Sequence, residues 1–219
     1  MRLLIKYPTR ERPEQFEETL GKYVDLLERP QDTLIHVVVD IDDQPMHLHA
    51  ATLLEVAKVE TELDLHPKRG KIAAINYATL TRPWDILLLA SDDMIPQLEG
   101  YDEIIRAAFQ THYPDTDGAL WIHDGRQDSI CTIVCMGRKY YERFGYIYHP
   151  AYTSLWCDNE QTEVAVNLGK MLKLPSIIRN ESPDWFGSHK RDALYRRNNA
   201  WFKRDRMTYR KRRKAGFPI

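Results

Sequence analysis

The chain has 219 residues and is 43% hydrophobic, which is enough for a buried core and too much for a disordered protein. No apolar run approaches the roughly 20 residues of a membrane span, and the first apolar segment is too short for a secretory signal. Three cysteines without a CxxC pair argue against a disulfide framework or a zinc site. We therefore expect a cytoplasmic protein with buried, reduced thiols.

The formal net charge of −1 conceals a strong asymmetry. Between Lys190 and Lys214 there are twelve Lys or Arg residues and only two acids, Asp192 and Asp205, so this segment carries +10 and the rest carries −11. We expect a basic, aromatic C-terminal extension over 190–219. Its residues fit a nucleic-acid surface, an amphipathic helix on the periphery of an anionic membrane, or a cover packed on the acidic body.

Hydrophobic periodicity predicts strands alternating with helices over the first ninety or so residues. In chain order we expect a strand at 3–5, a helix at 13–27, a strand at 33–39, a helix at 46–57, a half-exposed strand at 59–65, a helix at 72–80 and a strand at 85–90. Beyond these we expect a helix at 101–109, strands at 119–122 and 130–135, helices at 140–144 and 158–172, and a last strand at 174–178. The alternation predicts βαβ units and a largely parallel sheet.

The central feature is an apolar run, Ile86 to Ala90, followed by two adjacent acids, Asp92 and Asp93. The unbroken run is typical of a strand buried on both faces of a sheet. Ligands bind outside the carboxyl ends of such strands, and paired carboxylates there suit a hard divalent cation that also meets substrate phosphates. The alternative is a surface turn, because Ser and Asp favour turns.

Other polar residues are expected at the same edge of the sheet. A basic loop follows the first strand, and acids follow the second. The helix that precedes the acidic strand carries Lys71 and Asn76. Together these residues predict a site for a nucleoside diphosphate and its metal.

Taken in order, these segments resemble the GT-A glycosyltransferases, particularly the family-2-like enzymes, over roughly 1–192. The resemblance rests on Tyr7-Pro8-Thr9-Arg10-Glu11-Arg12-Pro13, Asp40 and Asp42, Gly70-Lys71-Ile72-Ala73-Ala74-Ile75-Asn76, Ser91-Asp92-Asp93, Asp158-Asn159-Glu160, and His189 followed by Arg191-Asp192. It implies a Rossmann-like, mixed, mostly parallel sheet flanked by helices. It also implies a single catalytic domain over 1–189, with a nucleotide-binding half at about 1–95 and an acceptor half at about 96–189.

The resemblance further implies roles for single residues. Thr9 and Arg10 would border the nucleotide, Asp40 would bind the base with Asp42 near it, and Lys71 and Asn76 would line the donor site. Asp92 would contact the ribose or the sugar. Asp93 and His189 would ligate Mn²⁺ or Mg²⁺, and Asp158 would be the general base, with Glu160 as the competing choice. The family's metal motif is D-x-D, and Ser91 stands here in place of the first acid.

The function that we expect is metal-dependent transfer of a sugar from a nucleotide-sugar, with UDP favoured, to an acceptor hydroxyl, inverting the anomeric centre. The acceptor could be a hydroxymethylated base in phage DNA, a cell-surface glycan or a lipid-linked molecule. The second hypothesis is a nucleotidyltransferase. Such an enzyme needs a glycine-rich loop after the first strand, and Pro8-Thr9-Arg10 contains no glycine. A nucleic-acid-binding protein without catalysis is the third.

Overall fold

The computed structural model describes residues 1–67, 70–79, 83–182 and 191–218. In this part of the chain a seven-stranded mixed sheet has the order β3-β2-β1-β4-β7-β6-β8. Its strands are β1 (Leu3–Thr9), β2 (Thr33–Asp40), β3 (Glu60–His66), β4 (Ile86–Leu89), β6 (Ala119–Ile122), β7 (Ile133–Gly137) and β8 (Met171–Leu174). β3, β2, β1 and β4 are mutually parallel, whereas β7 is antiparallel to both of its neighbours, β4 and β6. The predicted mixed, mostly parallel sheet is confirmed.

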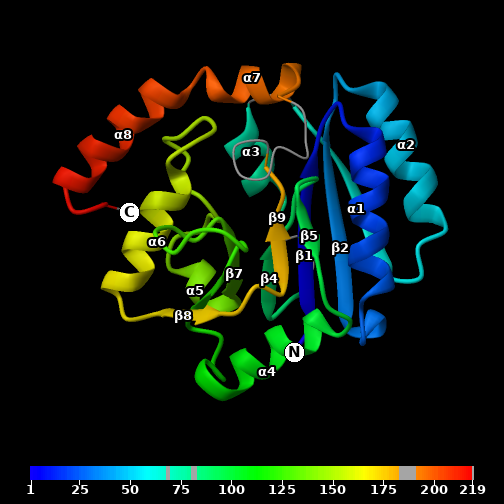
Figure 1. The fold of residues 1–219 in the computed structure, drawn as a ribbon, viewed down its shortest axis with the longest axis horizontal. Helices are drawn as coiled ribbons and strands as arrows, with labels where there is room; N and C mark the ends of the chain where they lie inside the picture. The colour runs from blue at the N-terminus through cyan, green and yellow to red at the C-terminus, as the bar shows by residue number, and fades with distance from the viewer. Residues whose placement is uncertain (68–69, 80–82, 183–190, 219) are drawn as a thin grey trace.

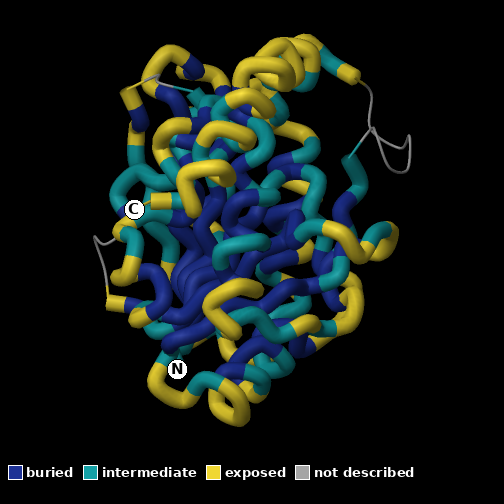
Figure 2. Tube along the Cα trace, turned by 90° about the vertical axis from the view of Figure 1, so that its left-hand side faces the viewer, coloured by how far each residue is buried: buried dark blue, intermediate teal, exposed yellow. Residues whose placement is uncertain are grey.

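Helices cover both faces of this sheet (Figure 1). One apolar core contains residues of α1 (Pro13–Asp25), α2 (Gln44–Glu55) and α4 (Tyr101–His112). The other contains residues of α3 (Lys71–Asn76), α5 (Arg138–Glu142) and α6 (Cys157–Asn167). Figure 2 shows the strands as a buried centre beneath more exposed helices.

The β4 strand has the double burial that its sequence predicts. Ile86 and Leu88 belong to the first core, and Leu87 and Leu89 to the second. Successive side chains of a strand point to opposite faces, so an unbroken apolar run buries both of them. Each of these four side chains is at most 3% exposed, and β4 therefore fixes the acids that follow it at the edge of the sheet.

The expectation of a helix over 158–172 is wrong at its end. α6 stops at Asn167, Gly169 has a left-handed φ of +64°, and Met171 already begins β8. β8 pairs in parallel with β6, about fifty residues earlier in the chain, and this tertiary pairing overrides the local helical pattern.

The expected last strand at 174–178 is also misplaced. The structure has β9 (Ile178–Asn180), which forms a second, two-stranded sheet with the unpredicted β5 (Met94–Pro96). Each is three residues long, too short for a periodic signal in the sequence.

The basic extension folds into α7 (Ala193–Asn199) and α8 (Phe202–Lys214), which run along the top of the molecule in Figure 1. Asp205 is fully buried and accepts hydrogen bonds from the backbone N–H groups of Thr153, Ser154 and Leu155. Arg212 makes a two-pronged ion pair with Glu160, with Nε–Oε2 and Nη2–Oε1 distances of 2.8 Å. The extension is thus fastened to the body, as the covering alternative predicts.

No helix in the described part of the chain is both long and apolar enough to cross a membrane. The three cysteines, Cys131, Cys135 and Cys157, are free and buried, as expected from their spacing.

Candidate functional site

A cavity of about 610 Å³ opens at the carboxyl ends of β1, β2 and β4. Such a volume is in the range of about 300–1,000 Å³ that is usual for small-molecule sites. Its walls include the following residues proposed from the sequence: Thr9, Arg10, Asp40, Lys71, Asp92, Asp93 and Asp158. Parallel strands bring their carboxyl ends to one edge, and that geometry brings together residues from positions 9 to 158.

Asp92 is the more buried of the two central acids, with 5% of its surface exposed. Its Oδ1 accepts a hydrogen bond of 3.0 Å from the Thr9 hydroxyl. Burial raises the pKa of Asp92 to about 7, while the nearby Arg12 opposes the rise and the adjacent Asp93 adds to it. The site therefore holds a carboxyl that is unusually sensitive to an added cation.

Asp93 is partly exposed and lines the same cavity. The Ser91 hydroxyl donates to its Oδ1, and the backbone of the same turn is closed by a bond from the Met94 N–H to the Ser91 carbonyl. Ser91, which replaces the first acid of the D-x-D pattern, thus orients Asp93.

Arg12 also lines the cavity, and its positive charge interacts with both Asp92 and Asp93. Its guanidinium binds Asp192 through Nε and Nη2, at 2.8 and 3.1 Å. Asp192 also caps α7 by accepting the Tyr195 N–H at 2.7 Å. The charges of Asp192, Asp92 and Asp93 raise the pKa of Arg12 despite its burial, so a fixed positive charge lies between the tail and the acids.

Arg10 and the acids after β2 form a second charged group. Its Nη1 binds Asp40 Oδ2 at 2.7 Å, and its Nη2 binds Asp42 Oδ2 at 3.2 Å. Asp40 also contacts His66 Nδ1 at 2.9 Å. Asp40 and Arg10 line the cavity, whereas Asp42 is exposed and outside its lining.

Lys71 enters the cavity from the first residue of α3. Gly70 is the N-cap of the helix, and its φ of +100° is a conformation that side-chain-bearing residues rarely adopt. A Cβ at Gly70 would lie 3.5 Å from the Thr153 side chain, so the glycine is needed for its conformation more than for space. The Gly70-Lys71 pair thus turns a cation toward the site.

Asp158 lies in the first turn of α6, and the positive charge of Lys71 acts on its carboxylate. Burial raises the pKa of the Asp158 carboxyl, and the bond from the Asn159 N–H and the charge of Lys71 oppose that rise. The helix cap is not Asp158 but Trp156, in the left-handed region at φ 65°. Asp158 is therefore free of the capping role that would otherwise explain an Asp at this place.

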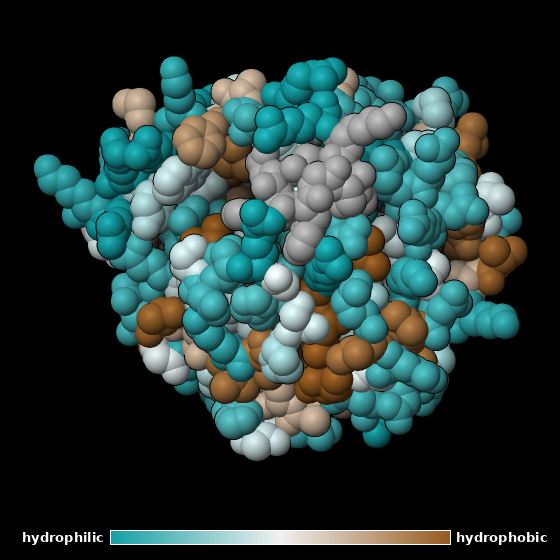
Figure 3. Space-filling model, viewed as in Figure 1, coloured by the Kyte–Doolittle hydropathy of each residue, from teal (hydrophilic) through white to brown (hydrophobic). Residues whose placement is uncertain are grey.

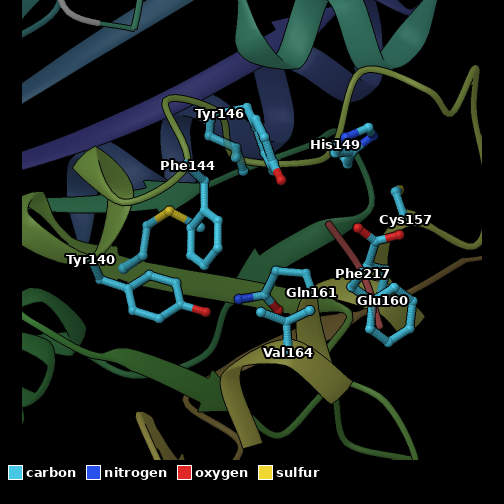
Figure 4. Close-up of a pocket in the computed structure, with 11 residues that line it drawn as sticks. Tyr140, Phe144, Tyr146, His149, Cys157, Glu160, Gln161, Val164 and Phe217 are labelled. Atoms are coloured by element: carbon cyan, nitrogen blue, oxygen red, sulfur yellow. The ribbon is translucent and has the colours of Figure 1, made fainter. Parts of the chain in front are cut away.

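Glu160 and Asn76 do not line the large cavity. Glu160 faces a separate small pocket of about 30 Å³ (Figure 4), where it binds Arg212 and accepts a 2.7 Å hydrogen bond from the Tyr152 hydroxyl. Asn76 bonds the backbone of Ile147 and Tyr148 with its side-chain amide. The structure thus shows both side chains in structural contacts.

His189 lies outside the described residues. Within those residues no group of three or more His, Cys, Asp or Glu side chains is arranged to hold a metal ion. Asp92 and Asp93 supply carboxylate oxygens only, and Mg²⁺ is commonly bound by one or two carboxylates together with substrate phosphates. This donor set therefore fits Mg²⁺ or Mn²⁺.

Sequence reasoning missed the contribution of the tail and of β9 to the cavity. The additional walls include Thr132, Asn180, Ser182, Tyr195, Asn198 and Trp201. The sequence predicts a basic extension over 190–219 without placing its residues in the site, and no local pattern indicates that β9 returns to pair with β5. Arg12 was also missed as a residue of the site. It belongs to the segment from Tyr7 to Pro13 that carries the resemblance, and its positive charge could have indicated its role.

No protein-family model matches the chain, and no curated protein matches it. Several solved structures, however, are similar to this chain. The mannosyltransferase PcManGT from Pyrobaculum calidifontis, in complex with GDP-Man and Mn²⁺, is 17% identical with a TM-score of 0.67 over 83% of this chain and 57% of that one. TarS 1-349 from S. aureus, in complex with UDP-GlcNAc, is 13% identical with a TM-score of 0.63 over 80% of this chain and 56% of that one.

A third structure is similar over nearly its whole length. The 4-diphosphocytidyl-2C-methyl-D-erythritol synthase from Anaerococcus prevotii is 11% identical, with a TM-score of 0.55 over 92% of this chain and 96% of that one. The chain spans less than two-thirds of the two structures named before it. These likenesses confirm the predicted GT-A fold.

Proposed function

We propose that the protein is a metal-dependent glycosyltransferase that moves a sugar from a nucleotide-sugar to an acceptor hydroxyl. The observation that carries this proposal is one cavity at the ends of β1, β2 and β4 that unites the acids Asp92 and Asp93 with Lys71 and Asp158. Donor-bound structures of the same fold, one with GDP-Man and one with UDP-GlcNAc, support it.

The donor would bind with its base toward β2 and its diphosphate toward Lys71. Asp40 offers a carboxylate near the base, and Arg10, held by Asp40 and Asp42, stiffens that wall. Thr9 borders the nucleotide and fixes Asp92. Lys71 supplies a positive charge for the phosphates, because ammonium groups bind them as point charges.

Asp93, with Asp92, would hold Mn²⁺ or Mg²⁺, and His189 stays a predicted third ligand. When bound, the ion supplies positive charge that stabilises the diphosphate as it leaves. Ser91 keeps Asp93 in position through its hydroxyl. Asp92 loses its proton more readily beside a cation, because an opposite charge favours the ionised carboxylate.

Asp158 would be the general base. Its carboxylate would take the proton of the acceptor hydroxyl as that oxygen bonds to the anomeric carbon and the sugar–phosphate bond breaks, releasing the nucleoside diphosphate. Burial raises the pKa of the Asp158 carboxyl, which suits a group that must accept a proton, and the charge of Lys71 opposes that rise. Attack from the face opposite the leaving group would invert the anomeric centre.

Isothermal titration of the full chain with UDP, GDP and CDP, each with and without MnCl₂, tests the proposal. We expect binding that requires Mn²⁺ and is strongest with UDP, and we expect Asp93→Asn to abolish it. Asp25→Asn is the matched control, because Asp25 is an exposed acid at the end of α1. Nucleotide binding that is indifferent to the metal and to Asp93 would refute the metal site.

A nucleotidyltransferase is the second candidate, because the likeness to the Anaerococcus prevotii synthase covers almost all of both chains. Pro8 and Thr9 end β1, and the loop of Arg10, Glu11 and Arg12 that follows contains no glycine, so it lacks backbone freedom for wrapping a triphosphate. Incubation with UTP and with UDP-sugars separates the two candidates. Release of pyrophosphate favours the second, and release of UDP from a UDP-sugar favours the first.

The acceptor is the least constrained part of the proposal. Three predictions stand for the acceptor: a hydroxymethylated base in phage DNA, a cell-surface glycan and a lipid-linked molecule. A cytoplasmic location also stays a prediction. A DNA acceptor requires a surface that binds DNA, and the exposed side of α8 is the candidate for that surface.

A further inference from the structure

The outer face of α8 carries cations with no acid among them. Eight of its thirteen residues are Lys or Arg, and its one acid, Asp205, is fully buried. Because successive helical residues turn by about 100°, Asp205, Tyr209 and Arg212 share the inner side. The exposed residues on the outer side are Lys203, Met207, Arg210, Lys211 and Lys214.

The helix that carries these cations is anchored to the body, and the described part of the protein does not neutralise Lys203, Arg210 or Lys211. The bonds of Asp205 and Arg212 to the body fix the orientation of the helix. Lys203, Arg210 and Lys211 form no ion pair with any described residue, whereas Arg213 pairs with Glu163 of α6. In Figure 3 the rim of the molecule over α7 and α8 is mostly hydrophilic.

Helix stability accounts for only part of this charge. Cations in the last turn are favourable because the C-terminus of a helix carries partial negative charge. The same dipole disfavours the cations Lys203 and Arg204, which lie in the first turn of α8. Arg204 lies over the Trp201 ring at 4.9 Å from its centroid, whereas neither the helix dipole nor an ion pair with a described residue accounts for Lys203.

The arrangement of apolar residues argues against insertion into a lipid surface. The exposed apolar residues of this region are Trp201, Phe202 and Met207. At about 100° per residue they point to three different sides of the helix, so they form no common face to bury among acyl chains.

The aromatic rings are also poorly placed for single-stranded nucleic acid. Tyr209 packs against Trp156 at 5.4 Å and against Phe217 at 5.9 Å between ring centroids. The two exposed rings already have partners within the protein: Phe202 packs against Trp156 at 5.6 Å, and the Arg204 guanidinium lies 4.9 Å from the centroid of the Trp201 ring. Rings with such partners are poor platforms on which bases could stack. The remaining contact is between cations and phosphates.

We propose that the outer face of α8 binds the phosphate backbone of duplex nucleic acid without regard to sequence. Thirteen helical residues span about 20 Å, and B-DNA presents a negative charge about every 1.7 Å along its axis. The row of cations on this anchored helix therefore meets a surface of complementary charge and greater length. Trp201, which precedes α8, also lines the large cavity, so a duplex on α8 lies at the cavity rim; a role in acceptor delivery rests on the proposed function.

Fluorescence anisotropy with a labelled 20-base-pair duplex of arbitrary sequence tests this proposal on the full chain without donor or metal. We expect binding at 50 mM NaCl that falls steeply by 200 mM, as counterion release requires. Lys203→Gln/Lys211→Gln should weaken binding roughly tenfold or more at 50 mM and reduce the slope of log K against log [NaCl] by about two. Lys22→Gln/Lys58→Gln, an equal charge change at exposed positions on α1 and before β3, is the matched control.

Three results would overturn the proposal: no duplex binding at 50 mM NaCl, equal weakening in the control variant, or binding only to vesicles with 30% phosphatidylserine. Nucleotide binding by Lys203→Gln/Lys211→Gln is measured in parallel. Neither residue lines the cavity, so nucleotide binding should be unchanged. Loss of duplex binding with nucleotide binding intact separates this surface from the proposed chemistry.

Discussion

Arg12 and Asp192 are 180 residues apart in the sequence and form a two-pronged ion pair, at 2.8 and 3.1 Å. Arg12 follows β1, and Asp192 is the N-cap of α7. The pair therefore connects the loop after β1 to a helix that lines the cavity. This contact thus links the C-terminal helices, which Asp205 and Arg212 also hold to the body, to the positive charge beside Asp92 and Asp93.

Asp192→Asn tests this connection. Asparagine keeps a side-chain oxygen for the Tyr195 N–H, so the cap of α7 survives and only the ion pair is lost. Arg12 is then released toward Asp92 and Asp93, where it opposes a metal ion. We expect Mn²⁺-dependent nucleotide binding to weaken about threefold to tenfold by calorimetry. Glu142→Gln, which removes an exposed pair with Arg138 on α5, should leave it unchanged.

Asp158→Asn and Glu160→Gln separate the two candidates for the general base. We expect Asp158→Asn to lower the release of UDP from a UDP-sugar about 10²- to 10⁴-fold while donor binding persists. Glu160→Gln should keep turnover and lower the melting temperature, because Arg212 loses its charged partner. The reverse pattern would assign the base to Glu160.

Asp205→Asn should loosen the C-terminal helices. Both carboxylate oxygens accept backbone N–H groups in a fully buried position, and an amide replaces one acceptor with a donor. We expect a loss of about 2–4 kcal/mol in the free energy of unfolding in urea, with faster tryptic cleavage within α8. Glu163→Gln, at the rim of the same contact, should cost at most about 1 kcal/mol. If both variants lose the same free energy of unfolding, the buried contacts of Asp205 stabilise the C-terminal helices no more than the more exposed contacts of Glu163.

The lowered pKa of the buried Lys6 predicts that the stability of the protein depends on pH. Lys6 is fully buried in β1, 3.1 Å from His36 Nδ1, and burial lowers its pKa to about 7. Between pH 7 and the usual lysine value of about 10.4, the unfolded chain binds a proton that the folded chain does not. The free energy of unfolding should therefore rise with pH across this window, and below pH 7 the contribution of Lys6 is constant.

Lys6→Met removes that proton difference. Urea unfolding at pH 7, 8 and 9 should show a smaller rise for Lys6→Met than for the unmodified chain, whatever the absolute stability of the variant. Lys58→Met, at an exposed position, should retain the full rise. Parallel curves for all three proteins would contradict the assignment to Lys6.

The sequence by itself determined the order of the main strands and helices in the first ninety residues and the place of the acids after β4. These follow from local periodicity: an unbroken apolar run such as Ile86–Ala90 has few ways to be buried. Thr9, Arg10, Asp40, Lys71 and Asp93 could be placed at one edge because parallel strands end there together.

Only the tertiary structure decided which of the later residues join them. Asp158 faces the cavity and Glu160, two residues on, faces Arg212 in another pocket, because successive positions of a helix point about 100° apart. The pairing of β5 with β9, the salt bridge of Arg12 with Asp192 and the buried Asp205 join segments that are distant in the chain. Such contacts depend on how the whole chain packs, and no local pattern of residues encodes them.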